Sequence, residues 1–381
     1  SCSTPDADSE RIVPSSPPAA PQHLTTVTGR TSRGVHGVSV LLKRAYRIAD
    51  GRQAERIDAA PWRLIDTWHD DGDPSWSVVE HESELQPFRA QTDVVVVGTA
   101  HAPGGRPVEA MHVGIAVGAR RKVLAIFGDR RAVHRGDGIE PTFTEPAAFL
   151  TMPVRYDRAY GGRDETDPAL PLRYARNPMG RGFVLRASRE AVDGRALPNI
   201  EDPADLLTPQ RLCMLEPGRW IDQPLPAGLG WRQRDWYPRC ALMGALPPFL
   251  APGTVTAEER LGLVPADHVA LAWQHRLAVR EAAFGNGASL GLTFETLAPD
   301  ETMLLRGLTP SGRLDFHLPG EVPRLGLDLG DGVESLATRM DVVTLRPDEG
   351  VMEIVWRAER TIGPAVAWSR VRRLTAAVSD A

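Results

Sequence analysis

Cysteine and lysine are both scarce in this sequence of 381 residues. The three cysteines, Cys2, Cys213 and Cys240, form no CxxC pair, so their spacing excludes a paired-cysteine zinc site and favours reduced thiols in the cytoplasm. Lys43 and Lys122 are the only lysines, and arginine supplies the other basic side chains. Because arginine pairs with carboxylates through two parallel hydrogen bonds, it is the cation best suited to protein interfaces.

Long hydrophobic runs and a strong charge imbalance are also missing. The longest purely aliphatic run, residues 94–97, is far too short to span a bilayer. The net charge of −5 creates no global field that would attract nucleic acid or an anionic membrane. No stripe of basic and aromatic residues indicates binding to single-stranded nucleic acid. We therefore expect neither nucleic acid nor a membrane as a partner.

Proline and glycine, by contrast, are abundant, with 33 and 35 residues. Both interrupt helices, so they favour short strands joined by many turns. The chain also exceeds the length that a single hydrophobic core usually organises. These features predict a mainly β fold of two β-sandwich or barrel-like lobes, with a long irregular ordered segment and a few short helices.

The chain divides into four predicted segments by composition. The N-terminal residues include few large apolar side chains, so they cannot bury enough surface to offset the entropy of ordering. In the middle, prolines and glycines recur without a clear period, which is typical of an ordered irregular segment with a function. The predicted segments are a flexible tail at 1–33, an N-terminal β lobe at 34–140, an irregular motif-rich segment at 141–252 and a C-terminal β lobe with a short helix at 253–381.

One serine lies in a pattern that resembles a hydrolase nucleophile. Residues 287–291 read Gly-Ala-Ser-Leu-Gly, and His317 follows Ser289 in the order that serine hydrolases require. A nucleophile elbow needs a helix after the serine, but residues 292–297 have a strand pattern. The interval between Ser289 and His317 is also too short to hold an acid-bearing strand and a crossover helix. We predict that the protein is not an enzyme and keep a serine hydrolase using Ser289 and His317 as an alternative.

Motifs for cofactors and metals are missing from the sequence. The glycines at 285, 287 and 291 do not satisfy GxGxxG, and no phosphate-binding GxxxxGK[ST] loop occurs. There is no HExxH, and the acidic loop at 70–73 lacks the closing glutamate of an EF-hand. We expect no cofactor and no metal.

Nine tryptophans are present, and most are expected in the core. Trp231 and Trp236 lie close in sequence to Arg234 and Arg239, and tryptophan and arginine are enriched in interface hot spots. These four residues are a possible partner surface, with a place in the core as the other interpretation. Tryptophans also serve as sugar platforms, so a carbohydrate-binding or structural β-module is the second alternative function.

An ordered series of turn-fixing residues runs through the middle of the chain. Its glycines permit positive φ or close backbone approach, and its Asn-Pro and Pro-Asn pairs set turns. Its acidic and arginine side chains can tie irregular backbone groups that would otherwise stay unpaired. The series consists of Asp93, Gly98, Pro103, Gly128, Asp129, Arg130, Gly161, Gly162, Asn177, Pro178, Gly180, Gly182, Pro198, Asn199, Glu201 and Pro203.

This series, in this order, resembles the domain of unknown function 2169 family, which is found beside type VI secretion genes in bacteria. The resemblance covers about Val38 to Arg357. Members of that family are regarded as adaptors or chaperones that link toxic effectors to the secretion spike. The resemblance therefore implies a cytoplasmic, non-enzymatic adaptor or chaperone whose partners are a secreted effector protein and a spike component. It assigns the motif residues to architecture and not to catalysis.

Overall fold

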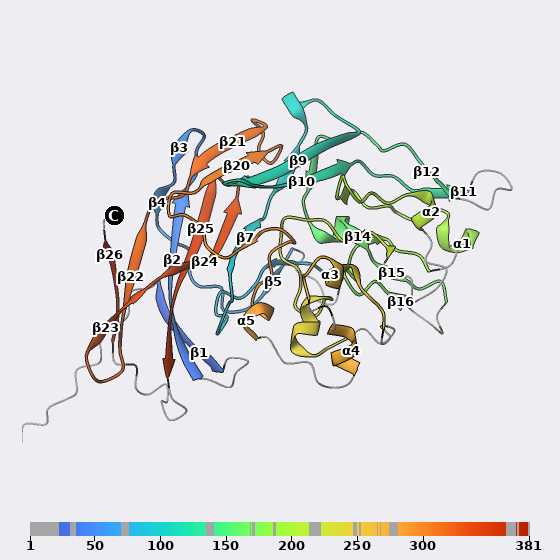
Figure 1. The fold of residues 1–381 in the computed structure, drawn as a ribbon. Coiled ribbons are helices and arrows are strands. Elements are labelled where there is room, and N and C mark those ends of the chain that lie inside the picture. Colours follow the sequence, from blue (N-terminus) through green and yellow to red (C-terminus); the bar gives the residue numbers. More distant parts are fainter. Residues whose placement is uncertain are drawn as a thin grey trace, which may run out of the picture.

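Strands dominate the architecture, and the helices are short, so the predicted mainly β class is confirmed. Figure 1 shows the long strands of the largest sheet gathered on the left, and an irregular region with short strands and most of the helices on the right. The computed structural model describes residues 23–30, 36–69, 76–134, 141–167, 169, 172–185, 188–212, 222–246, 250, 253–264, 266, 268–273, 281–362, 371 and 373–379.

The largest sheet has seven strands and is built around two long antiparallel neighbours. β2 (His36–Arg47) and β25 (Val351–Ile362) pair along their full length of 12 residues. The order is β1-β2-β25-β24-β7-β19, with β4 also paired to β2 and β7 running parallel to β24. The other strands are β1 (Leu24–Arg30), β4 (Glu55–Ile57), β7 (Thr92–Val96), β19 (Thr293–Phe294) and β24 (Arg339–Arg346).

A second sheet of six strands shares its hydrophobic core with the first. One buried cluster holds Val95 and Ile354 of the first sheet together with Ile115 and Leu305 of the second. Each sheet contains strands from both sides of the irregular segment, so residues 34–140 and 253–381 pair with one another within both sheets. The order is β18 (Ile200–Glu201), β10 (Arg120–Phe127), β9 (Ala110–Val117), β20 (Thr302–Arg306), β21 (Arg313–His317) and β3 (Arg52–Gln53).

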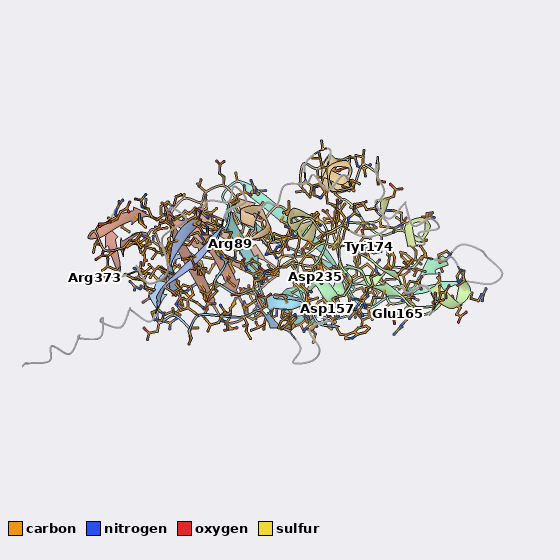
Figure 2. The ribbon with its side chains drawn as sticks, turned by 90° about the horizontal axis from the view of Figure 1, so that it is seen from below. Arg89, Asp157, Glu165, Tyr174, Asp235 and Arg373 are labelled. Carbon is orange, nitrogen blue, oxygen red and sulfur yellow. The ribbon has the colours of Figure 1, made fainter. Side chains whose placement is uncertain are left out.

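Smaller sheets surround these two. A three-stranded sheet of β23 (Val333–Ala337), β22 (Val322–Asp328) and β26 (Arg373–Ser379) lies at the outer edge, where Figure 2 labels Arg373. The two-stranded sheets are β5 (Thr67–Trp68) with β6 (Val79–His81), β8 (Thr99–His101) with β13 (Thr151–Pro153), β11 (Ala132–His134) with β12 (Pro141–Phe143), β14 (Tyr160–Gly161) with β17 (Arg181–Gly182), and β15 (Arg163–Asp164) with β16 (Leu172–Arg173).

The predicted flexible tail at 1–33 contains a strand, which corrects that prediction for its described part. β1 forms seven antiparallel register pairs with β2 and buries Leu24 and Val27. The β-branched run at 25–28 favours an extended backbone, and β2 provides the hydrogen-bonding partner that composition alone cannot reveal. Residues 1–22 and 31–33 lie outside the described residues.

The irregular segment has a hydrophobic cluster of its own, which includes Tyr160, Tyr174, Phe183 and Tyr237. Figure 2 shows Tyr174 in this part of the molecule, well apart from Arg89 of the sheet region. Short helices lie around this cluster and in the residues that follow it in the sequence. These short helices are η3 (Tyr156–Arg158), α1 (Arg189–Val192), α2 (Pro209–Leu212), η5 (Arg239–Met243), α3 (Ala257–Arg260), α4 (His268–Trp273) and α5 (Glu281–Phe284).

Candidate functional site

Asn177, from the predicted series, fixes a tight crossing of backbone in the irregular segment. Its side chain is fully buried, and Nδ2 donates to the carbonyl oxygens of Tyr156 at 2.8 Å and Tyr160 at 3.1 Å. Gly161 has φ 147°, and a Cβ there would lie 2.1 Å from the Asn177 carbonyl oxygen. The asparagine and the glycine therefore have an architectural role, because they let two segments approach at a distance that no larger residue permits.

Asn199 holds a second crossing in the same segment. Its Nδ2 donates to the carbonyl oxygen of Phe127 at 3.1 Å and to Oδ1 of Asp129 at 3.0 Å. Its Oδ1 accepts from Nη1 of Arg181 at 3.0 Å. Every polar atom of this buried amide is thus used inside the protein, so none remains for a substrate.

Arg130 and Glu201, predicted as structural residues, form an ion pair close to Asn199. The guanidinium of Arg130 also lies 4.1 Å from the ring centre of Phe127. The Glu201 carboxylate accepts from the Leu207 amide at 2.5 Å, and burial raises the pKa of Glu201.

Of the remaining members of the series, Gly162 and Gly180 lie at the Asn177 crossing, and Gly182 lies against Pro198. Gly128 closely approaches the backbone of Ala147, whereas Gly98 lies against Pro347. Pro103 begins the short helix η2 (Pro103–Gly105), and Pro178 and Pro203 lie in turns.

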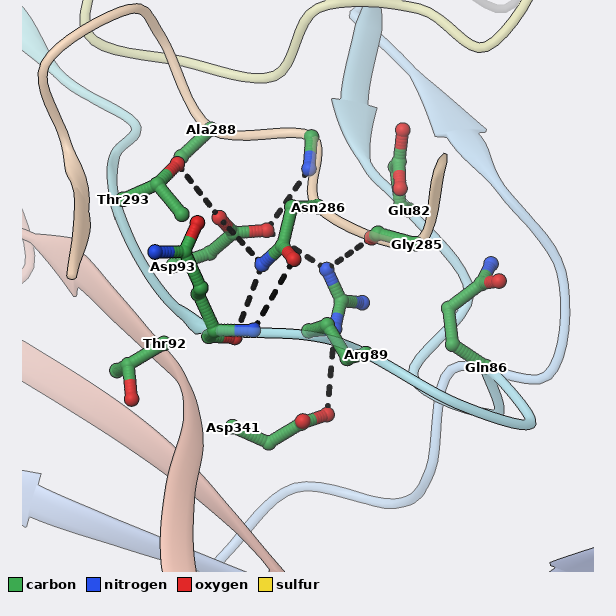
Figure 3. A network of polar contacts seen from close by, with 12 residues as sticks. Glu82, Gln86, Arg89, Thr92, Asp93, Gly285, Asn286, Ala288, Thr293 and Asp341 are labelled. Atoms are coloured by element: carbon green, nitrogen blue, oxygen red, sulfur yellow. Dashed lines mark hydrogen bonds and ion pairs between the residues drawn. The ribbon is translucent and has the colours of Figure 1, made fainter. Parts of the chain in front are cut away.

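Asp93, the first member of the series, lies at the centre of a third network (Figure 3). Its carboxylate accepts from Nη1 of Arg89 at 2.7 Å, the Gly287 amide at 2.8 Å, and Nδ2 of Asn286 and Oγ1 of Thr293, both at 3.1 Å. These bonds tie β7 to the chain at 286–293. The position of that segment therefore depends on one buried carboxylate.

Asp341 extends this network into the neighbouring strand β24. Its Oδ2 accepts from Nε of Arg89 at 3.2 Å, and its carboxylate also receives two hydrogen bonds from Arg357. Burial alone would raise the pKa of Asp341, but the two guanidinium groups hold it below its usual value. The two arginines thus favour the ionised form of this buried carboxyl group.

The predicted partner surface is wrong for three of its four residues. Trp231, Trp236 and Arg239 are buried, with exposed fractions of 4%, 1% and 1%. Arg239 pairs with Glu82 through two hydrogen bonds, one of them 2.9 Å between Nη2 and Oε2. Arg234 keeps partial exposure, but it contacts Asp66 at 3.1 Å and Glu82 at 3.5 Å. Glu82 is far from this segment in the sequence. Because its carboxylate pairs with the arginines, the segment can be buried.

Trp76 and Trp236 differ in how much ring surface they leave accessible. Trp76 is 61% exposed, and the guanidinium of Arg163 lies 3.6 Å from its ring centre and occupies one face. Trp236 is buried, and its ring packs edge-on against Tyr156 at 5.5 Å. Trp236 therefore offers no ring face to a sugar.

Ser289 and His317 are not brought together. Ser289 is fully buried, with its Oγ 2.8 Å from the Tyr156 hydroxyl and 2.9 Å from the Gly230 carbonyl oxygen. His317 lies exposed on β21, and its Nδ1 is 3.3 Å from the carbonyl oxygen of Asp300. The chain after Ser289 enters β19 and not a helix. The GxSxG pattern here forms a buried turn whose serine is used in packing.

A pocket of about 650 Å³ opens beside this turn, and we call it the cationic pocket. Arg120, Lys122 and Arg232 surround the turn at 288–293 and each donates to one of its carbonyl groups. Nη1 of Arg120 donates to Thr293 at 2.6 Å, and Nε of Arg232 donates to Ala288 at 2.8 Å. Nζ of Lys122 donates to Leu290. Arg120 and Lys122 are two residues apart on β10, so both side chains leave the same face of the strand.

The three cations have no directly paired carboxylate among the described residues, although the more distant carboxylates of Asp93 and Glu82 act on Arg232. Among the described residues, none of Arg120, Lys122 and Arg232 forms an ion pair. Burial, together with the nearby charge of Arg232, lowers the pKa of Lys122 to about 7, whereas Asp202 opposes the shift. Burial also lowers the pKa of Arg232. Because backbone carbonyls satisfy the N–H groups without cancelling the charge, the pocket favours an anion.

The charge of the other lysine, Lys43, is neutralised by carboxylates. Lys43 is fully buried, and its Nζ lies 2.7 Å from Oε1 of Glu84 and 3.2 Å from Oε1 of Glu353. Sequence reasoning missed the pocket at Lys122. The signal that could have found it was the alternation of residues 120–127, which places Arg120 and Lys122 on one strand face.

Apolar side chains lie next to the cations. Leu242, Leu263 and Leu290 line the cationic pocket together with Arg120 and Arg232. Two further apolar residues are exposed on the adjoining turns: Met243 of η5 is 42% exposed, and Leu261, which ends α3, is 61% exposed. The pocket therefore combines positive charge with an uncovered apolar border.

Two other features were searched for in the described part of the chain. No group of three or more His, Cys, Asp and Glu side chains there is arranged to hold a metal ion. None of the described helices combines the length and apolar character needed to cross a membrane.

The fold and site define a β-rich protein whose irregular segment is fixed by buried polar networks and whose surface carries a cationic pocket. The family model described as "Uncharacterized protein conserved in bacteria (DUF2169)" matches residues 33–357, and the chain belongs to this family. Neither a curated protein nor a solved structure matches the chain.

Proposed function

We propose that the protein is a non-enzymatic adaptor or chaperone that binds a type VI secretion effector and helps to load it onto the secretion spike. The effector and a spike component would be its partners in the cytoplasm. The proposal is supported by the resemblance of the motif series to a family regarded as adaptors beside type VI secretion genes; the family model itself, which matches residues 33–357, is described as uncharacterized.

The observation that carries the proposal is the contrast between the motif residues and the cationic pocket. Asp93, Asn177 and Asn199 are fully buried and use their polar atoms to hold the backbone. The pocket, in contrast, leaves Arg120 and Arg232 without a directly paired carboxylate among the described residues. A rigid frame that presents unsatisfied charge suits binding, because a preordered surface loses little entropy when a partner docks.

Deletion of the gene in a bacterium with an active type VI system tests this function. We expect the effector to disappear from the secreted fraction while other effectors of the same system are still secreted. The tagged protein should co-purify with that effector and with a spike component. Secretion of every effector at the wild-type level in the deletion strain would contradict the proposal.

One variant in the same strain distinguishes the adaptor function from the hydrolase alternative. We expect Ser289→Ala, expressed at the wild-type level, to restore effector secretion fully, because the adaptor function needs no nucleophile. A folded Ser289→Ala protein that failed to restore secretion and had also lost a hydrolytic activity would favour the hydrolase instead.

A further inference from the structure

We infer that the cationic pocket binds an acidic, amphipathic segment of a partner protein, with a carboxylate seated between Arg120 and Arg232. The apolar side chains of that segment would cover the leucines that line the pocket. This inference rests on the proposed function for the existence of a protein partner, and it adds the chemistry by which the partner is recognised.

The cations of the pocket differ from the buried cations elsewhere in the protein, which are paired with carboxylates. Arg239 pairs with Glu82, and Arg176 pairs with Glu258, both through two hydrogen bonds. Lys43 has two carboxylates within ion-pair distance. Arg120 and Arg232, by contrast, donate only to carbonyl groups in the described part of the chain, and the guanidinium of Arg120 also lies 4.4 Å from the ring centre of Phe294. A carboxylate from outside would complete the pairing that these other sites already have.

Arg232 has the donor geometry for such a carboxylate. Its Nε donates to the Ala288 carbonyl oxygen, and this is the only hydrogen bond of its guanidinium to a described residue. No described residue accepts from its two terminal nitrogens, which suits them to an outside carboxylate. A planar guanidinium recognises a carboxylate through two parallel hydrogen bonds, and half-burial in the pocket strengthens them relative to water.

The apolar border favours a protein segment over a small free anion. Inorganic phosphate would satisfy the cations but leave Leu242, Leu263 and Leu290 uncovered. A pocket of about 650 Å³ also holds much more than one such ion. Exposed Met243 and Leu261 extend the apolar surface beyond the pocket. An acidic side chain flanked by leucine-like residues matches both the charge and the apolar surface.

Calorimetric titration of the full chain with a defined probe tests the inference. The probe is a synthetic peptide of three Leu-Glu-Glu-Leu repeats, and its partner probe has glutamine in place of every glutamate. We expect the glutamate peptide to bind about tenfold or more tightly than the glutamine peptide. This preference should shrink as salt is added, because the charges are partly exposed. Equal binding of the two peptides, or binding of neither, would overturn the inference.

Residue 121 provides a matched control for the pocket cations. Arg120→Gln and Arg232→Gln should each weaken binding of the glutamate peptide about fivefold or more. Arg121→Gln removes the same charge from the next position on β10, where the side chain leaves the opposite face, and should leave the affinity unchanged. Equal losses from Arg120→Gln and Arg121→Gln would mean that only the overall charge matters, and the pocket assignment would be wrong.

Two further outcomes are informative. Arg232→Lys retains the charge, so a folded Arg232→Lys protein should bind better than Arg232→Gln, which guards against misreading a folding defect. If inorganic phosphate bound with the same dependence on Arg120 and Arg232 while the glutamate peptide did not bind, the pocket would be a phosphate site and the inference would fail.

Failure of this inference is distinguishable from failure of the proposed function. If Arg120→Gln and Arg232→Gln proteins still co-purified with the effector at the wild-type level, the pocket would not be the docking site, but the adaptor function would stand. If the pocket bound the glutamate peptide as expected while gene deletion left effector secretion intact, the adaptor function would fail.

Discussion

Replacing Asp93 with asparagine tests the idea that one buried carboxylate positions the chain at 286–293. Asparagine has nearly the same volume, so Asp93→Asn creates no cavity and isolates the loss of charge. In the folded protein this carboxylate accepts four hydrogen bonds, from Arg89, Asn286, Gly287 and Thr293. An amide can accept through only one of its two terminal atoms, so at least part of this set loses its acceptor.

The expected cost follows from the burial of the pair. Breaking a fully buried ion pair by removing one partner costs about 3–5 kcal/mol, because the remaining charge stays buried. Because Arg89 retains Asp341 as a second partner, the expected cost lies toward the lower end of that range. We therefore expect Asp93→Asn to lower the free energy of unfolding by about 3 kcal/mol.

Urea denaturation at neutral pH, followed by tryptophan fluorescence, measures this change. Asp328→Asn provides a control, because this aspartate lies in a surface turn and only accepts backbone amides. Its effect should stay within about 0.5 kcal/mol. In addition, Arg89→Met combined with Asp93→Asn should cost less than the sum of the two single changes.

A loss smaller than about 1 kcal/mol for Asp93→Asn would refute the reasoning, because a surface-like value is inconsistent with a buried charged acceptor. If the losses of unfolding free energy from Arg89→Met and Asp93→Asn were strictly additive, the reasoning would also be contradicted, because additivity would mean that the two side chains do not interact.

Three further outcomes are expected. Asn177→Asp removes both donations to buried carbonyls and should cost about 2–4 kcal/mol in urea denaturation; a neutral result would contradict the architectural role. Arg176→Met should cost about 3 kcal/mol, and the double change with Glu258→Met should be closer to wild type. The lowered pKa of Lys122 means that the unfolded state binds more protons between about pH 7 and 10, so stability should rise with pH across that interval. Lys122→Met should flatten this rise, and an unchanged profile would argue against the shift.

The local patterns of the sequence were sufficient to predict the class of the fold. Abundant proline and glycine and short apolar alternations predicted short strands and turns, and the strands are there. An architectural role was also predicted for Asn177 and Asn199, because asparagine beside proline has a local conformational meaning, and both side chains donate to backbone carbonyl groups in the structure. The family, too, follows from the order of such local motifs.

The burial of charged residues could not be predicted in the same way. Arg239 and Trp236 read as a partner surface because arginine and tryptophan are enriched at interfaces. In the structure Arg239 is buried against Glu82, which is 157 positions away in the sequence. Whether an arginine is exposed depends on whether a carboxylate reaches it, and that carboxylate comes from another part of the chain.

By itself, then, the sequence determined the properties that depend on neighbouring residues: the strand content, the turns and the family. The tertiary structure alone decided which strands share a sheet, which cations find carboxylates and which do not. Arg120 and Lys122 come together with Arg232 only because β10 and the turn at 288–293 are adjacent in space. The physical reason is that backbone conformation is set by local sterics, whereas the balance of charge at a site is a sum over segments that only folding brings together.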